Sequence, residues 1–547
     1  MIKSYLEMRR KELKVPLDLA SVQFDATEHS ASEEVVQFPG QAQSSSLSFL
    51  SRVIVEALKG AITGDRATIA LEVKFGEIVL DLLRLSYWAL EVGRARENSH
   101  SIAFNETVSP VLAWLVSDNT SGEDAVYRHW PERKQLTPLK RSIYNKGLAG
   151  LRVARMTVLK SHGRIDFCHE NTLLAEARES ISGSWINIHP RQFSWPGLNN
   201  PAFAQVKKSV ACEEVVIAWL DALQSLQHLE KMLIEKLRSG AISSIRYHLA
   251  MAFADIPFVE SLSGRFLGEH FYSGTPKYYG RLLSWRYQQL GRQVTRFAHG
   301  GERVFFDDIL WPLTELAYCD TYVCHSATES NVLSKRLKKS SLATDQTKKI
   351  KFVSSGSEKH KEIFRKASEK KGAGQKQSSQ SVLYVPSVYF GESFVGQAFF
   401  RVNDVHYFKW QQNLFRTLDA LGIPARIKVH PRGLKNLDTA IERLSEKLVS
   451  GTFNPNDFDE DIFLFDHAGT AFFDALASGK AIVYLNMGVR PLDPKVRPYL
   501  EERCAIVDCS SDSENVFCIS VQSVKEAFKK ALEIRGCPES FFFRFFA

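Results

Sequence analysis

Short apolar runs alternate with amphipathic segments after about residue 290, and this alternation restricts the fold more than any other feature. Segments with helical spacing of apolar residues separate the runs, for example WQQNLFRTLDAL (410–421) and TAFFDALAS (470–478). The runs are RQVTRFA (292–298), DTYVCH (320–325), KKIKFVSS (348–355), SVLYVPS (381–387), ARIKVHP (425–431), DIFLFDH (461–467), KAIVYLN (480–486) and CAIVDC (504–509). Apolar strands joined through helices belong to parallel sheets that are covered on both faces. The sequence therefore predicts an α/β fold with parallel strands.

The first half of the chain has a different pattern of apolar residues, which predicts mostly helices. Apolar residues at helical spacing predict helices over residues 48–63, 77–95, 211–238 and 243–254. Only RIDFC (164–168) and SWINI (184–188) have the composition of strands. Because 547 residues are too many for one hydrophobic core, we expect two or three domains.

Changes in composition along the chain predict where these domains divide. Residues 334–380 are rich in Lys, Ser and Gln, and we expect a solvated linker or insertion there, with a tether to nucleic acid or anionic lipid as the alternative. The expected divisions are a polar N-terminal segment (1–47), a helix-rich domain ending in an α/β part (48–355), a basic linker or insertion (356–380), a C-terminal α/β domain (381–535) and an aromatic tail (536–547).

Charge and cysteine usage exclude some classes of protein. The net charge of +8 is small for this length, so a dedicated nucleic-acid binder is not expected. The eight cysteines form no C-x-x-C pair, so we expect free buried thiols in a reducing cytoplasm; a zinc site is the minor alternative. The N-terminus resembles no signal peptide, and no apolar stretch is long enough to span a bilayer.

The aromatic tail ESFFFRFFA (539–547) allows two interpretations. It packs as a terminal helix across two domains, or it inserts shallowly into a membrane surface. We therefore expect a cytoplasmic protein, with contact at the inner face of the inner membrane as the second interpretation.

Polar motifs follow several of the predicted strands, at the edge where α/β sheets bind ligands. His299, Gly300, Gly301 and Glu302 follow the run RQVTRFA. Two glycines allow positive φ or a close backbone approach to a ligand, and histidine can contact a phosphate or move a proton. A plain turn is an equal alternative.

Two further motifs in the second half carry charged groups. Glu315 lies where a helix leads into a strand, and Asp320 follows five residues later. Two roles are open for Glu315: a general base for an acceptor hydroxyl, or a partner in an ion pair. In KVHPRG, His430 ends a strand, Pro431 stops ladder pairing and Arg432 follows, and the His and Arg together can neutralise a phosphate.

The most specific motif is FLFDHAGTAFFDALASGKAIVYLN (463–486). An apolar strand ends at Asp466, a tight turn contains Gly469, and Thr470 starts a helix. The first N–H groups of a helix have no intrahelical partner, so this turn predicts an anion site; a helix cap without ligand is the alternative. Asp404 precedes another predicted helix and is either its cap or a nucleophile.

The order of these motifs resembles bacterial surface-carbohydrate transferases of the GT-B type, in particular the capsule and O-antigen transferases that use CMP-Kdo with retention. The motifs are HGG, Glu315, CD (319–320), LYVPS, a long helix, KVHP and FDHAGTAFFDALASGKAIVYLN, covering about residues 290–510. The resemblance implies two Rossmann-like domains that face a cleft, the N-terminal one for the acceptor and the C-terminal one for the sugar nucleotide. The sequence departs from the family at Ala298, where Gln is usual, and at Asp474, where Glu is usual.

The resemblance also implies roles for individual residues. Glu315 or Glu302 would be the acid/base, with His299 beside them, and Asp404 would form the covalent sugar adduct. The donor site would comprise His430, Pro431, Arg432, Asp466, Gly469 and Thr470, with Gly300 and Gly301 allowing close backbone approach.

The same reasoning sets the expected substrates. No metal and no separate cofactor are expected, because the sugar nucleotide, CMP-linked, is itself a substrate and a single phosphate needs no magnesium. The acceptor would be a saccharide or a lipid-linked glycan. Two alternatives stay open: another donor, such as a UDP-sugar or CDP-glycerol, and a non-catalytic protein of polysaccharide assembly.

Overall fold

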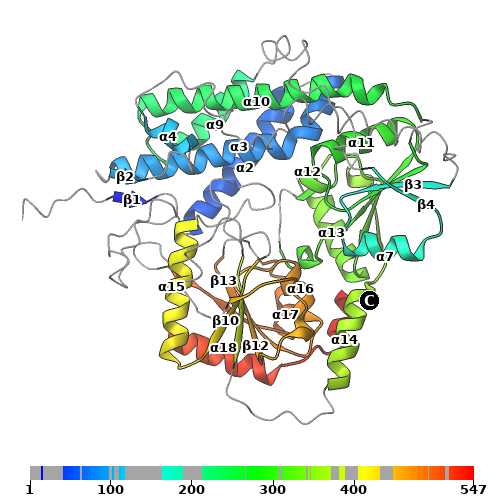
Figure 1. The fold of residues 1–547 in the computed structure, drawn as a ribbon. Coiled ribbons are helices and arrows are strands. Elements are labelled where there is room, and N and C mark those ends of the chain that lie inside the picture. The colour runs from blue at the N-terminus through cyan, green and yellow to red at the C-terminus, as the bar shows by residue number, and fades with distance from the viewer. Residues whose placement is uncertain are drawn as a thin grey trace, which may run out of the picture.

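The structure is a computed structural model that describes residues 14–16, 41–61, 65–97, 101–103, 110–117, 163–188, 212–264, 267–306, 311–340, 343–344, 347–370, 381–387, 404–430, 448–488, 490, 492–511 and 517–547. Figure 1 shows three parts: a layer of long helices at the top, one sheet beside it, and a second sheet below. The chain passes from the helices through the first sheet into the second.

The N-terminal sheet has six strands, and each strand is parallel to its neighbours. Their order across the sheet is β4 (Ser184–Asn187), β3 (Arg164–Cys168), β5 (His270–Ser273), β6 (Gln293–Phe297), β7 (Thr321–Cys324) and β8 (Lys351–Ser354). The covering helices include α7 (Thr172–Ser180), α11 (Tyr278–Gln289), α12 (Trp311–Glu315) and α13 (Ala327–Lys339). The predicted strands RIDFC and SWINI are confirmed.

The C-terminal sheet also has six strands, again all parallel. Their order is β11 (Leu448–Val449), β10 (Ala425–Lys428), β9 (Val382–Val385), β12 (Ile462–Phe465), β13 (Ala481–Asn486) and β14 (Ala505–Asp508). In chain order this is 3-2-1-4-5-6, the doubly wound arrangement, in which ligands bind where the strand order reverses. That point lies between β9 and β12.

Both faces of the C-terminal sheet are covered, as its apolar strands predict. One face packs against α15 (Asp404–Ala420) and α18 (Val521–Glu533). The other packs against α16 (Thr470–Leu476), α17 (Arg497–Glu501) and the tail helix α19 (Glu539–Phe545). A minor antiparallel pair, β15 (Ser510–Ser511) and β16 (Phe517–Cys518), follows β14.

The helical layer has its own apolar core. It consists of α2 (Gln41–Ala61), α3 (Asp65–Glu97), α4 (Pro110–Val116), α9 (Glu213–Leu226) and α10 (Lys231–Glu260), with the small pair β1 (Lys14–Pro16) and β2 (Ser101–Ala103) beside it. Because α9 and α10 lie between β4 and β5 in the chain, half of this layer is an insertion into the N-terminal sheet. The two Rossmann-like units and the helix-rich N-terminal part thus give a GT-B-like architecture.

Three expectations about the elements need correction. The helix expected over 211–238 is two helices, because the backbone is extended at Gln227 and Leu229 turns into the core. Residues 41–47, expected as a polar linker, belong to α2. The first half of the expected linker 356–380 forms α14 (Glu358–Lys370), because Ile363 and Ala367, one turn apart, are buried.

The aromatic tail packs across both units, as the first interpretation predicts. Phe541, Phe542, Phe545 and Phe546 are buried in a core that also contains Val304–Phe306 from the N-terminal unit. The same core contains Phe472 and Phe473 of α16, so one apolar cluster spans the boundary between the two units.

The structure bears on the state of the cysteines and on the presence of membrane-spanning helices. All eight cysteines are free thiols; six of them are buried as expected, whereas Cys509 and Cys518 are partly exposed. Burial raises the pKa of Cys504 to about 12, so this thiol stays protonated at neutral pH. No helix within the described ranges has both the length and the apolar character needed to cross a bilayer.

Candidate functional site

The carboxyl edges of the two sheets meet where the turn after β6 contacts the start of α16. His299 is exposed, and Gly300 and Gly301 follow with φ of 86° and 72°, the left-handed region that favours glycine. A Cβ on Gly300 would collide with Glu302 Oε2 and lie 2.9 Å from Thr470 Oγ1, and a Cβ on Gly301 would collide with the edge of the Phe473 ring. The glycine pair is therefore what lets the two units approach each other here.

Glu302 is the unusual group at this boundary. It opens the 3-10 helix η6 (Glu302–Phe305), and its side chain is buried, with a relative exposure of 6%. Among the residues that the structure describes, its Oε2 atom has no hydrogen-bond partner. Its Oε1 atom lies 3.9 Å from the Arg490 guanidinium, at the outer limit of an ion pair. A buried carboxylate oxygen without a donor is costly, so it is a candidate for interaction with a ligand.

Arg490 supplies the positive charge at the same place. It lies in the loop after β13, and its Nη1 donates to the carbonyl of Ala468 at 3.2 Å. Its guanidinium also stacks on the Phe306 ring of the N-terminal unit, 4.3 Å from the centroid. Arg490 is not among the residues predicted from the sequence, although a signal is present there: a Gly-Val-Arg segment begins two residues after the strand KAIVYLN.

Helix α16 begins at Thr470, directly after the Gly469 turn, as the sequence predicts. Gly469 is the N-cap and no side chain caps the helix, while Thr470 is exposed. The helix has only seven residues, so its dipole is small. Backbone N–H groups at this turn could contact an anion, but the Arg490 charge has to supply most of the attraction.

Glu315 does not fit the role of general base. Its carboxylate accepts hydrogen bonds from four groups: Thr275 Oγ1, Arg303 Nη2, Trp311 Nε1 and the Tyr322 hydroxyl. Its relative exposure is 2%, and all four donors belong to the N-terminal unit. The ion-pair alternative is therefore correct, and Glu315 serves to hold Arg303, the residue after Glu302.

The carboxylate of Asp466 is likewise hydrogen-bonded to other side chains of the fold. The Tyr384 hydroxyl, the Tyr407 hydroxyl and Trp410 Nε1 all donate to its carboxylate, the last two at 2.9 Å. Burial raises the pKa of this carboxyl above its ordinary value, although the three donors oppose the shift. Asp466 thus ties β9 and α15 to the end of β12.

Of the remaining residues predicted to bind the sugar nucleotide or to react with it, only the side chain of His430 is among those that the structure describes. His430 is exposed just after β10, and strand β9 lies between β10 and β12, so the two strands that lead to His430 and to Thr470 are about 10 Å apart by ideal strand spacing. Asp404 is the first residue of α15, but its side chain lies outside the described residues, as do Pro431 and Arg432.

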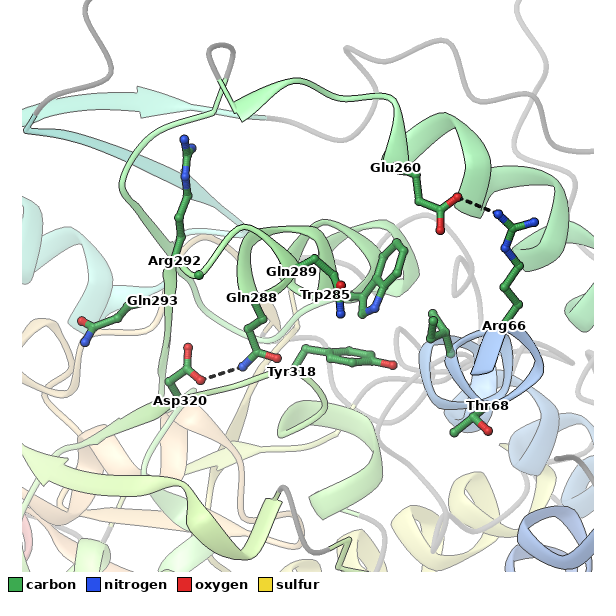
Figure 2. A pocket seen from close by; sticks show the side chains of 12 residues that line it. Arg66, Thr68, Glu260, Trp285, Gln288, Gln289, Arg292, Gln293, Tyr318 and Asp320 are labelled. Atoms are coloured by element: carbon green, nitrogen blue, oxygen red, sulfur yellow. Dashed lines mark hydrogen bonds and ion pairs between the residues drawn. The ribbon is translucent and has the colours of Figure 1, made fainter. Parts of the chain in front are cut away.

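A separate hollow of about 1130 Å³ lies at the opposite edge of the N-terminal sheet. Figure 2 shows Trp285, Gln288 and Tyr318 along its floor and the Arg66–Glu260 ion pair at its rim. Asp320 lies here, where its carboxylate accepts from Gln288 Nε2 at 2.7 Å and from the Val294 amide at 2.8 Å. Because Asp320 precedes β7, the hollow is at the amino ends of the strands, away from the Glu302 boundary.

The described side chains also bear on metal binding. Within the part of the chain that the structure describes, no group of three or more His, Cys, Asp or Glu side chains is arranged to hold a metal ion. The charged side chains at the boundary include Glu302, Arg490 and the Arg336–Asp493 ion pair.

No family model and no curated protein sequence matches this chain. Among solved structures, a UDP-GlcNAc 2-epimerase from Neisseria meningitidis bound to UDP-GlcNAc is similar with a TM-score of 0.37 and 9% identity, covering 70% of this chain and 96% of that one. An α,α-trehalose 6-phosphate synthase from Burkholderia multivorans gives 0.35 and 9%, covering 68% and 90%. A UDP-glucosyltransferase from Polygonum tinctorium gives 0.32 and 10%, covering 68% and 92%. These TM-scores are below 0.5, so we assign no function from the likeness.

Proposed function

We propose that this chain is a glycosyltransferase whose reaction takes place at the boundary between its two Rossmann-like units. The observation that carries the proposal is the pairing of Glu302 with Arg490. A guanidinium and a buried carboxylate oxygen that has no hydrogen-bond partner in the described part of the chain lie together at the carboxyl edges of two parallel sheets. Sugar transfer requires one group of each kind, a base for the acceptor hydroxyl and a cation for the leaving phosphate.

Glu302 is the general base of this proposal. A base must keep an acceptor site free for the proton that it removes, and Glu315 and Asp466 have each committed their carboxylates to several protein donors. Glu302 has no such donor on Oε2 among the described side chains. Gly300 and Gly301 have no side chains of their own, and Glu302 Oε2 lies against the Gly300 backbone.

Arg490 is the group that stabilises the leaving phosphate. Its contact with the Ala468 carbonyl holds it beside Gly469 and Thr470, whose backbone N–H groups would share the charge. A charge-assisted contact from Arg is stronger than a neutral one, and a single phosphate can be neutralised in this way without a metal. His430, at the same sheet edge, would contact the nucleotide from the other side of the strand-order reversal.

The finer assignment is a donor of the CMP-Kdo kind, transferred with retention to a surface polysaccharide or glycolipid. Asp404 would attack the anomeric carbon while the bond to the CMP oxygen breaks and CMP leaves with the electron pair. The acceptor hydroxyl, deprotonated by Glu302, would then displace the Asp404 carboxylate. The support for this assignment is the motif order in the sequence.

A nucleotide panel and three variants test the proposal. A nucleotide that binds the folded chain raises the melting temperature, so CMP, UDP, GDP and CDP distinguish CMP-sugar, UDP-sugar, GDP-sugar and CDP-glycerol donors. Transfer from the donor so identified should be lost in Glu302→Gln, Asp404→Ala and His430→Ala. Full activity in all three variants would overturn the mechanism. A chain that responds to no nucleotide and co-purifies with an assembly protein would overturn the enzyme assignment.

A further inference from the structure

A buried ionic bridge holds α16 from its second turn, away from Glu302. Asp474 lies on α16, with 3% of its surface exposed. Its Oδ2 atom is 2.6 Å from Lys359 Nζ, and its Oδ1 atom is 3.0 Å from His360 Nε2. Both partners belong to α14, which precedes the C-terminal sheet in the chain, so the bridge joins α16 to a helix outside that sheet.

The surroundings of His360 make the bridge sensitive to its protonation state. The Asp474 carboxylate can only accept, so Nε2 carries the proton and donates. The other ring nitrogen, Nδ1, is buried and has no hydrogen-bond partner among the described residues. A second proton would therefore have no acceptor there, and burial lowers the pKa of His360 below its ordinary value.

The groups that face His360 come from three elements. Asp474 faces it from α16 and Lys359 from its own helix. From the β7–α13 turn, the His325 ring lies 5.6 Å away, and His325 itself pairs with Glu329 at 3.1 Å. Lys359 and His325 both disfavour a charged His360 ring, while Asp474 favours it.

Geometry connects this bridge to the candidate site. Thr470 and Asp474 are four residues apart, one turn of the same short helix. Phe473, beside Asp474, is the residue against which Gly301 packs, and its ring also contacts His325 and His360 at 5.2 and 5.1 Å. A shift of Asp474 would therefore move Phe473 and Thr470 relative to the Gly300–Gly301 turn.

We propose that Asp474 is a positioning residue, held by Lys359 and His360, that sets the start of α16 against the Gly300–Gly301 turn, and that this arrangement loosens when a second proton on the buried Nδ1 atom of His360 leaves that atom as a donor without an acceptor. The positioning part concerns the fold, and its effect on catalysis rests on the proposed glycosyl transfer. No part of the bridge touches the substrate in this proposal.

The sign of the pH dependence follows from the direction of the shift. Between the lowered pKa of the folded state and the ordinary value of 6.5, the unfolded chain binds more protons than the folded one. The stabilisation from burying the His360 ring in its neutral form is therefore complete above about pH 6.5 and is lost as the pH falls toward the lower value.

Hydrogen exchange on the full chain tests the positioning without any substrate. In Asp474→Ala and His360→Leu, backbone amides of residues 299–306 and 470–476 should exchange at least about tenfold faster than in the wild type, with α10 unchanged. His360→Gln retains an N–H donor near the position of Nε2, so the amides of both segments should exchange as slowly as in the wild type. Glu362→Gln is the matched control, since Glu362 pairs with Arg365 on the exposed face of the same helix.

The pH profile separates positioning from general support of the fold. Wild-type protection of residues 470–476 should decrease as the pH falls from 7 to 5, whereas the His360→Gln profile should be flat. If CMP binding is established, Asp474→Ala should lower kcat by about 100-fold, because a displacement near 1 Å has an effect of that size. KM for the donor should change less.

The outcomes distinguish this inference from the proposed function. Faster exchange at both segments, without any nucleotide binding, would support the positioning while refuting the transferase. Unchanged exchange in Asp474→Ala, or a pH profile of His360→Gln identical to that of the wild type, would overturn the positioning even if transfer were demonstrated.

Discussion

The interior of the N-terminal unit and the boundary between the units each bury a glutamate, and the two differ in their partners. Glu315, in the interior, accepts from four side-chain donors, including Arg303. Glu302, at the boundary, has one oxygen without a partner among the described residues and an arginine at 3.9 Å from the other. Burial is similar at 2% and 6% exposure, so burial alone does not separate a structural carboxylate from a candidate catalytic one.

The number of donors is what separates them. A carboxylate that is fully hydrogen-bonded is stabilised in place and cannot accept a further proton without losing a bond. A carboxylate with an open oxygen is destabilised in the free protein and gains a partner when substrate binds. The two sites are adjacent in the chain, because Arg303, the ion-pair partner of Glu315, directly follows Glu302.

The largest expected effect is on transfer in Glu302→Gln. Removing the base should lower kcat by about 10² to 10⁴. The free energy of unfolding should change by less than about 1 kcal/mol, because the lost carboxylate oxygen had no protein donor. Rate assays and urea unfolding of one preparation measure both quantities. If Glu302→Gln were fully active, or if it unfolded far more easily than the wild type, Glu302 would not differ from Glu315 in the way proposed.

Glu315→Ala should show the opposite pattern. Removal of the partner of a buried Arg303 charge should destabilise the protein by about 3–5 kcal/mol. Urea unfolding measures this change, and the exposed pair partner Glu362→Ala is the control. If Glu315→Ala were as stable as the wild type, the assignment of Glu315 to an internal ion pair would be wrong.

Gly301→Ala tests the contact that brings the units together. The added Cβ meets the Phe473 ring at a φ of 72°, so we expect a destabilisation of about 1–3 kcal/mol. Gly422→Ala is a matched control, because Gly422 has a φ of 65° and no atom within 4 Å of the added Cβ. The excess cost of Gly301→Ala over Gly422→Ala, measured by thermal unfolding, isolates the boundary contact; equal costs would mean that the contact is absent in solution.

Arg490→Gln should have the smallest effect in the absence of ligand. Its contact with the Ala468 carbonyl is partly exposed, so unfolding should change by less than about 1 kcal/mol. Nucleotide affinity should fall about tenfold, since one charge-assisted contact is lost. Arg497→Gln, at an ion pair with Asp508 in the same unit, should leave affinity unchanged. Equal losses in both variants would point to a general charge effect.

The sequence could predict the parallel strands and the turns because their signals are local. Continuous apolar runs such as IFLF and AIVYLN fix buried strands, and the paired Gly300 and Gly301 indicate positive φ. The break at residues 227–230 was missed because Leu229 is apolar and fits a continuing helix until its burial in the core is seen. The same is true of α14, where Ile363 and Ala367 are sparse apolar positions in a charged segment.

The candidate site was harder to predict because its selection depends on partners distant in sequence. Glu302 and Glu315 look alike in sequence, and only the donors Thr275 and Tyr322 show which one is committed. Asp466 is predicted to bind the sugar nucleotide because it follows a strand. In the structure its carboxylate accepts hydrogen bonds from Tyr384, Tyr407 and Trp410. Arg490 was not named, since an arginine after a strand is common and its neighbours Phe306 and Ala468 come from both units.

Isothermal titration with CMP, UDP, GDP and CDP on the wild type, Glu302→Gln and Arg490→Glu tests the central claim most directly. If the boundary is a sugar-nucleotide site, one nucleotide binds both the wild type and Glu302→Gln, and Arg490→Glu lowers the affinity by at least about tenfold. Absence of binding by all four nucleotides, or equal affinity in Arg490→Glu, would contradict it.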